Sequence, residues 1–88
     1  MNEMKYVVVD SKEAGRQLFT FPKNINHSEF AEILSYIKTG GTNTWVRVYR
    51  KPVSAGFTDG LTCYGRSESL DLGCLPSDTE LLRKGGYE

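Results

Sequence analysis

The chain has 88 residues, of which 39% are hydrophobic and 25% are charged. This length holds one small domain and no second one, so we expect a single domain over residues 1–88. The composition is that of a folded globular protein and excludes a disordered chain. Eleven basic and eleven acidic residues cancel, which excludes a whole-molecule positive field that would attract nucleic acid or an anionic membrane.

Targeting and membrane signals are absent from the sequence. The apolar run near the N-terminus is too short for a signal peptide, and no segment reaches the roughly 18 apolar residues of a membrane span. Two cysteines are too few to indicate the disulfide framework of a small secreted protein. We therefore expect a cytoplasmic protein with no membrane partner.

The first third of the chain predicts two strands. Residues 5–10 predict a strand with successive apolar residues, which places apolar side chains on both of its faces. This pattern is typical of a strand covered on both faces. Residues 11–15 predict a turn, with a short helix over 11–14 as the alternative. Residues 17–21 predict a second strand, which Pro22 ends.

The clearest helix pattern covers residues 27–39. Asn26 is a suitable N-cap, and Glu29 three residues later completes a pair like a capping box. Gly40 supplies a left-handed stop. One apolar stripe at helical spacing indicates the face that packs on the core, made of Phe30, Ile33, Leu34 and Ile37.

A third strand is predicted over residues 43–51, which are rich in β-branched and aromatic residues and are followed by Pro52. The small and polar residues of 53–60 indicate a loop or the start of a bulged strand.

The last third predicts two more strands, over residues 61–66 and 69–74, and a short terminal helix. Ser77 and Glu80 form a second capping-box pair, so this helix should run to about Lys84. The predicted fold class is α+β: a mainly antiparallel sheet of about five strands, with one main helix packed on one face and a short C-terminal helix.

The strand over residues 43–51 carries the main candidate for a binding surface. Because side chains alternate between the faces of a strand, Val46 and Val48 should point into the core. The opposite face should be aromatic and basic and should extend onto the neighbouring strand. The candidate site residues are Trp45, Arg47, Tyr49, Lys51, Tyr64 and Arg66.

Three interpretations of this face stand beside one another. Trp, Tyr and Arg dominate the centres of protein interfaces. Aromatic rings with interleaved cations also hold single-stranded nucleic acid, through base stacking and phosphate contacts. The third interpretation is structural, with cross-strand aromatic and cation–π pairs that only stabilise the sheet. A core-facing Trp45 would exchange the two faces.

The sequence gives no support for catalysis. Cys63 and Cys74 lie at inward positions and are expected to pack in the core as small hydrophobic residues. Neither has the close partner that a zinc site needs, and a pairing of either with His27, the only histidine, is a remote alternative. No glycine-rich phosphate loop is present. We expect a protein that is not an enzyme and that binds neither a metal nor a small-molecule cofactor.

The leading functional hypothesis is a small cytosolic binding or regulatory module that acts through protein contacts, with a protein partner or a second copy of itself. The alternative is a weak binder of single-stranded nucleic acid that uses the same aromatic and basic face.

Overall fold

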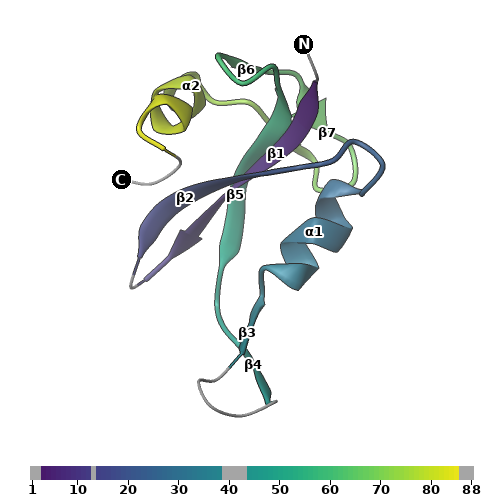
Figure 1. Cartoon of the computed structure of the whole chain (residues 1–88), viewed down its shortest axis with the longest axis vertical. Coiled ribbons are helices and arrows are strands. Elements are labelled where there is room, and N and C mark those ends of the chain that lie inside the picture. The colour runs from purple at the N-terminus through teal and green to yellow at the C-terminus, as the bar shows by residue number, and fades with distance from the viewer. Residues whose placement is uncertain (1–2, 13, 39–43, 86–88) are drawn as a thin grey trace.

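Figure 1 shows a computed structural model of the chain, which describes residues 3–12, 14–38 and 44–85. A central antiparallel sheet separates the two helices, and a second, two-stranded sheet extends from one end. No helix in the described ranges is long and apolar enough to cross a membrane. The elements are β1 (Met4–Ser11), β2 (Gly15–Phe21), α1 (His27–Ile33), β3 (Tyr36–Lys38), β4 (Trp45–Arg47), β5 (Lys51–Thr58), β6 (Cys63–Tyr64), β7 (Arg66–Ser67), β8 (Leu72–Gly73) and α2 (Pro76–Arg83).

The main sheet has the strand order β2–β1–β5–β6, and each neighbouring pair is antiparallel. β1 is buried on both of its faces. Val7 and Val9 pack into a cluster that Phe30 of α1 covers, whereas Tyr6 and Val8 pack into a second cluster with leucines of α2. Each of these four β1 residues is at most 1% exposed. The prediction of a strand covered on both faces is confirmed.

β5 is a central strand, although its sequence predicted a loop or a bulged strand start. Pro52 lies inside β5, opposite Val9, where the β1–β5 register shifts. A proline is tolerated there because the ladder is irregular and needs no N–H from it. At Gly56 there is no room for a side chain, because a Cβ would lie 2.4 Å from the Tyr64 carbonyl oxygen. The small residues of this stretch thus allow close packing. The loop alternative is wrong, whereas the alternative of a bulged strand start agrees with the register shift at Pro52.

α1 is shorter than predicted. It ends at Ile33, and the Ser35 amide donates a 3.0 Å hydrogen bond to the Glu32 carbonyl in its last turn. The predicted apolar stripe therefore splits, because Ile33 is 61% exposed and Ile37 belongs to β3. The strand pairing of β3 with β4 overrides the helical pattern of its sequence. The predicted stop at Gly40 lies outside the described residues.

The strand predicted over residues 43–51 is divided between two sheets. Its middle part forms β4, which pairs with β3 so that Ile37 lies opposite Val46. Residues 48–50 have no strand conformation, and Lys51 begins β5 of the main sheet. The predicted start at position 43 lies outside the described residues. The change of direction after β4 places the β3–β4 hairpin away from the main core (Figure 1).

The two predicted strands near the C-terminus are much shorter in the structure. β6 pairs with the end of β5 through Phe57 and Tyr64. β7 and β8 form a separate ladder of two residue pairs, in which Ser67 lies opposite Leu72. Ser67 is buried and Leu72 packs against the α1 side of the core. These short ladders fold the chain back over the main sheet before α2 begins.

The terminal helix is confirmed, but its predicted cap is wrong. α2 begins at Pro76, and the Asp78 carboxylate accepts a 3.0 Å hydrogen bond from the Leu75 amide. Ser77 and Glu80, the predicted pair, are both exposed. The helix ends before Gly85, whose φ of 87° is in the left-handed region, as expected for a glycine that terminates a helix.

The predicted architecture as a whole requires correction. The predicted sheet of about five strands with one main helix on one face is replaced by a four-stranded antiparallel sheet, two small two-stranded sheets and two short helices. α1 has seven residues and α2 has eight. The described part of the chain is mostly strand. Each short helix packs on a different face of β1.

Candidate protein-binding surface

Exposed apolar side chains gather on one part of the molecule. Among the described residues, eight large hydrophobic side chains are exposed, and six of them lie between positions 33 and 49. Leu61 and Tyr64 are the two outside this region. We call the six together the hairpin surface, because the β3–β4 hairpin and its two flanks carry them: Ile33, Tyr36, Ile37, Trp45, Val46 and Tyr49.

The projection of the hairpin explains this exposure. β3 and β4 form a sheet of their own at one end of the molecule, and neither belongs to the main sheet (Figure 1). Trp45 is 62% exposed and Tyr49 is 76% exposed. Val46, predicted to point into the core, is 42% exposed, so that prediction is wrong. Its side chain does alternate with the aromatic and basic ones, but neither face of the hairpin lies on the main core.

Polar contacts hold the hairpin against the end of α1. The Val48 amide donates a 2.7 Å hydrogen bond to the Ser35 carbonyl. The Arg50 guanidinium donates a 3.0 Å hydrogen bond to the carbonyl of Leu34, which is buried. These two bonds join the segment after β4 to the residues that link α1 to β3. The apolar side chains are therefore presented on an anchored structure.

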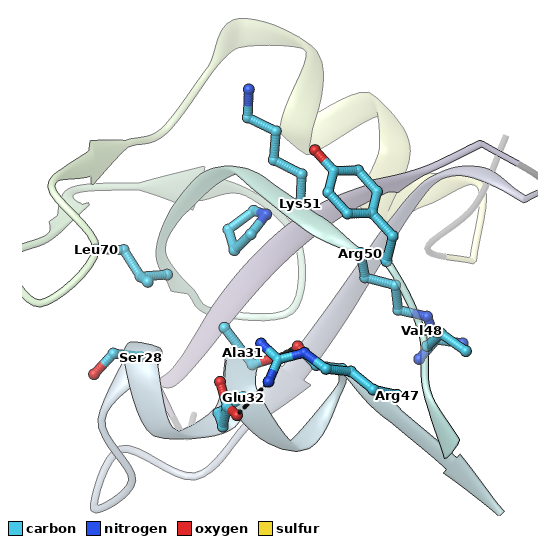
Figure 2. A pocket seen from close by; sticks show the side chains of 11 residues that line it. Ser28, Ala31, Glu32, Arg47, Val48, Arg50, Lys51 and Leu70 are labelled. Atoms are coloured by element: carbon cyan, nitrogen blue, oxygen red, sulfur yellow. Dashed lines mark hydrogen bonds and ion pairs between the residues drawn. The ribbon is translucent and has the colours of Figure 1, made fainter.

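Arg47 is engaged on the hairpin itself. Its guanidinium lies 3.7 Å from the Glu32 carboxylate and 5.7 Å from the centre of the Tyr36 ring. Figure 2 shows the Arg47 and Glu32 side chains pointing toward one another. Because both side chains are more than half exposed, this ion pair contributes little to stability and mainly orients the Arg47 side chain.

A hollow of about 710 Å³ separates α1 from the segment that leaves the hairpin (Figure 2). Ala31 and Glu32 form one wall, and Arg47, Arg50 and Lys51 contribute to the other. A second hollow of about 520 Å³ lies where Val48, Tyr49 and Arg50 meet Ile37 and the β1–β2 turn. The segment of residues 48–50 lines both hollows. The hairpin surface is thus accessible and uneven, with apolar and cationic groups side by side.

The six predicted site residues do not form one patch. Trp45, Arg47, Tyr49 and Lys51 lie on or next to the hairpin, whereas Tyr64 and Arg66 lie on β6 and β7. In Figure 1 these strands are at the opposite end of the main sheet from the hairpin. The Tyr64 hydroxyl donates to the Glu3 carboxylate, and Arg66 pairs with Asp71 at 2.5 Å. The predicted extension of the patch across neighbouring strands is not present.

Sequence reasoning missed four members of the hairpin surface. Ile33 and Ile37 were assigned to the core because they fit a helical stripe. Val46 was assigned to the core by strand alternation, and Tyr36 was not considered. The available signal was the aromatic and β-branched pair at positions 36–37, residue types that are enriched in strands. Val48, which was predicted to point into the core, is half-buried and lines both hollows.

The thiols and the imidazole lie on different sides of the main sheet. Cys63 and Cys74 pack against the cluster that contains Tyr6 and Val8, and burial raises the pKa of the Cys63 thiol to about 11. His27 is buried on the other side, where its ring contacts Phe21 edge to face. Both cysteines pack against the core as predicted, although they are only half-buried, and neither is paired with His27. In the described ranges no three potential metal ligands come together.

No family model, curated protein or solved structure matches this chain. The candidate site is therefore defined by its own residues and geometry.

Proposed function

We propose that this chain is a binding or regulatory module that contacts a protein through the hairpin surface. The observation that carries the proposal is the concentration of exposed large hydrophobic side chains there, six of the eight found among the described residues. Single exposed hydrophobic residues are common on protein surfaces, whereas a concentration of them in one region is typical of an interaction site. Here they lie on both faces of the hairpin, with Ile37 and Val46 on one face and the aromatic Tyr36 and Trp45 on the other.

The residue types support a protein contact. Trp45 and Tyr49 are large aromatic side chains with most of their surface exposed, and burial of such anchors supplies most of the binding energy in protein interfaces. Arg47 and Glu32 provide a charged rim beside them. An apolar centre with a polar margin is the usual composition of a protein interface.

Single-stranded nucleic acid is supported less well. Arg47 already pairs with Glu32, and Arg50 is held by a backbone carbonyl. Tyr64 and Arg66, which would have extended the stacking surface, lie elsewhere and have acidic partners. Among the described side chains, Lys12 and Lys51 are exposed cations that line hollows together with Tyr49. A backbone-tracking groove needs several free cations in a row, so the protein contact is the better supported function.

The test is a comparison of two variants of the full chain, each tagged and purified from its native host. Trp45→Ala with Tyr49→Ala removes the two most exposed aromatic anchors, and Leu61→Ala removes a similarly exposed hydrophobic residue outside the hairpin surface. We expect the double variant to lose its protein partners at least tenfold by quantitative mass spectrometry, because each anchor contributes about 2 kcal/mol or more. Leu61→Ala should retain them.

Far-ultraviolet circular dichroism should show the same fold for all three proteins, because the substituted side chains lie outside the core. If the double variant captures the same partners as the original chain, the hairpin surface is not the contact site. A parallel titration with single-stranded oligonucleotides follows Trp45 fluorescence. Quenching that weakens as salt rises would instead favour nucleic acid.

A further inference from the structure

The two strands of the hairpin share one sequence pattern. Each has an aromatic, an aliphatic and a cationic residue in that order: Tyr36, Ile37 and Lys38 in β3, and Trp45, Val46 and Arg47 in β4. Antiparallel pairing sets Ile37 opposite Val46 and sets each aromatic residue opposite a cation. A strand with this pattern is therefore complementary to an antiparallel copy of itself.

β4 has an open edge that is prepared for such pairing. The small sheet has only the order β3–β4 in the described part of the chain, so β4 is an edge strand. The ladder ends with Tyr36 opposite Arg47, and just beyond it the Val48 amide donates to the Ser35 carbonyl, as in a hydrogen-bonded pair in the same register. Because such pairs alternate along antiparallel strands, Val46 bonds toward β3. The N–H and C=O groups of Trp45 and Arg47 then point to the outer edge.

We propose that the protein partner is a second copy of this chain, paired antiparallel along β4 with the two-fold axis at Val46; this inference rests on the proposed function of the hairpin surface. The outward groups of Trp45 and of the partner's Arg47 then form one hydrogen-bonded pair, and symmetry supplies the other. Val46 faces the partner's Val46 in the closely spaced pair between them. The small sheet becomes a four-stranded sheet across the dimer.

Charge favours this arrangement over other ways of adding a strand. With antiparallel pairing about Val46, Arg47 lies opposite an indole and not opposite another cation, as it already lies opposite Tyr36 within the hairpin. A parallel copy would place the two Arg47 side chains side by side, which is unfavourable. An exposed strand edge beside apolar side chains is otherwise prone to unspecific pairing. A symmetric interface of this kind is closed and does not propagate.

The first test uses a disulfide across the proposed axis. In a closely spaced antiparallel pair the Cα atoms lie about 4.5 Å apart, which a disulfide spans without backbone movement. Val46→Cys should therefore yield a covalent dimer under mild oxidation. Arg47→Cys is the matched control, because its thiol faces the partner's Trp45 and not its own copy. The original chain measures any cross-linking through Cys63 and Cys74.

The second test introduces a charge of either sign at Val46. Val46→Lys and Val46→Glu should each be monomeric by light scattering, because each places two like charges opposite one another at the axis. Mixed in equal amounts, they should recover the dimer. Leu61→Lys, a charge introduced on an exposed hydrophobic residue elsewhere, should leave the dimer unchanged.

Failure of this inference is distinguishable from failure of the proposed function. A chain that stays monomeric over a concentration series to high micromolar overturns self-pairing, while capture of another protein that depends on Trp45 and Tyr49 would still support the hairpin surface. A dimer that survives both charged variants, or that cross-links as well through Arg47→Cys, places the contact on another surface. A chain that neither self-associates nor captures another protein through Trp45 and Tyr49 overturns both proposals.

Discussion

The hydroxyl of Tyr6 donates a 2.6 Å hydrogen bond to the Asp78 carboxylate, which joins β1 to α2 across 72 positions of sequence. Asp78 is 1% exposed, and its oxygens also accept hydrogen bonds from the Ser54 hydroxyl and the Leu75 amide. Burial and the adjacent carboxylate raise the pKa of Tyr6 far above its usual range, so its proton stays in place. One buried acid thus connects the central strands to the terminal helix.

Tyr6→Phe should destabilise the protein by about 1–3 kcal/mol, because it removes one donor from a buried carboxylate and leaves the packing unchanged. Urea unfolding followed by circular dichroism measures the change. Tyr49→Phe is the matched control, since Tyr49 is 76% exposed, and it should have almost no effect. Equal stability of the two variants would mean that the Tyr6 bond to Asp78 contributes nothing net.

Gly56→Ala should destabilise the protein by about 1–3 kcal/mol through overpacking. The new Cβ would meet the Tyr64 carbonyl oxygen at 2.4 Å and the Tyr6 ring at 3.2 Å. Gly73→Ala tests the same substitution where the new Cβ would make only an ordinary van der Waals contact, at 3.9 Å from the nearest atom. Thermal unfolding should show a lowered midpoint for Gly56→Ala alone. A normal midpoint would show that β5 and β6 separate easily at this position.

Acid should weaken the fold through His27. Its Nε2 donates a 2.8 Å hydrogen bond to the Gly56 carbonyl, and burial lowers its pKa below the ordinary 6.5. As the pH falls through 6.5, the unfolded chain takes up a proton before the folded chain does, so the free energy of unfolding decreases. Denaturant unfolding between pH 7.5 and 5 should show this loss. His27→Gln should reduce the pH dependence in that window, and an unchanged slope would contradict the account.

Cys63 should react slowly with iodoacetamide in the folded protein. Its pKa is raised to about 11, chiefly by burial, and the thiolate is the reactive species. The contribution of Cys63 to stability is complete below the unfolded pKa of 9.0 and is lost as the pH rises through 11. Cys74→Ser isolates the Cys63 reaction, which mass spectrometry follows against pH. Rapid labelling at neutral pH would indicate an activated thiol and not a packed one.

The sequence predicted best those elements whose structure follows from their own residues. Residues 5–10 are apolar at every position that the core needs, and β1 is buried on both faces. The terminal helix also has a clear start at Pro76 and a clear stop at Gly85. Its cap was missed because Asp78 reaches back to Leu75 from within the helix, where it also binds Tyr6 from the first strand.

The elements that were missed depend on distant partners. Ile37 fits both a helical stripe and a strand, and only the pairing of β3 with β4 decides between these. Gly56 and its small neighbours look like a loop until Tyr6 and Tyr64 occupy the space beside them. The same limit applies to the binding surface. Trp45 and Tyr49 were found from their types, whereas the separation of Tyr64 from them follows from the path of the chain.

The proposed role depends above all on an indole that is open to solvent in the monomer and covered in the complex. Trp45 is the only tryptophan, so quenching of its fluorescence by acrylamide measures this directly as protein concentration rises. We predict strong quenching and a long-wavelength emission maximum where light scattering shows a monomer, with quenching reduced as the dimer forms. Emission that is already shielded from acrylamide in the dilute monomer would contradict the account, because the indole would then belong to the core.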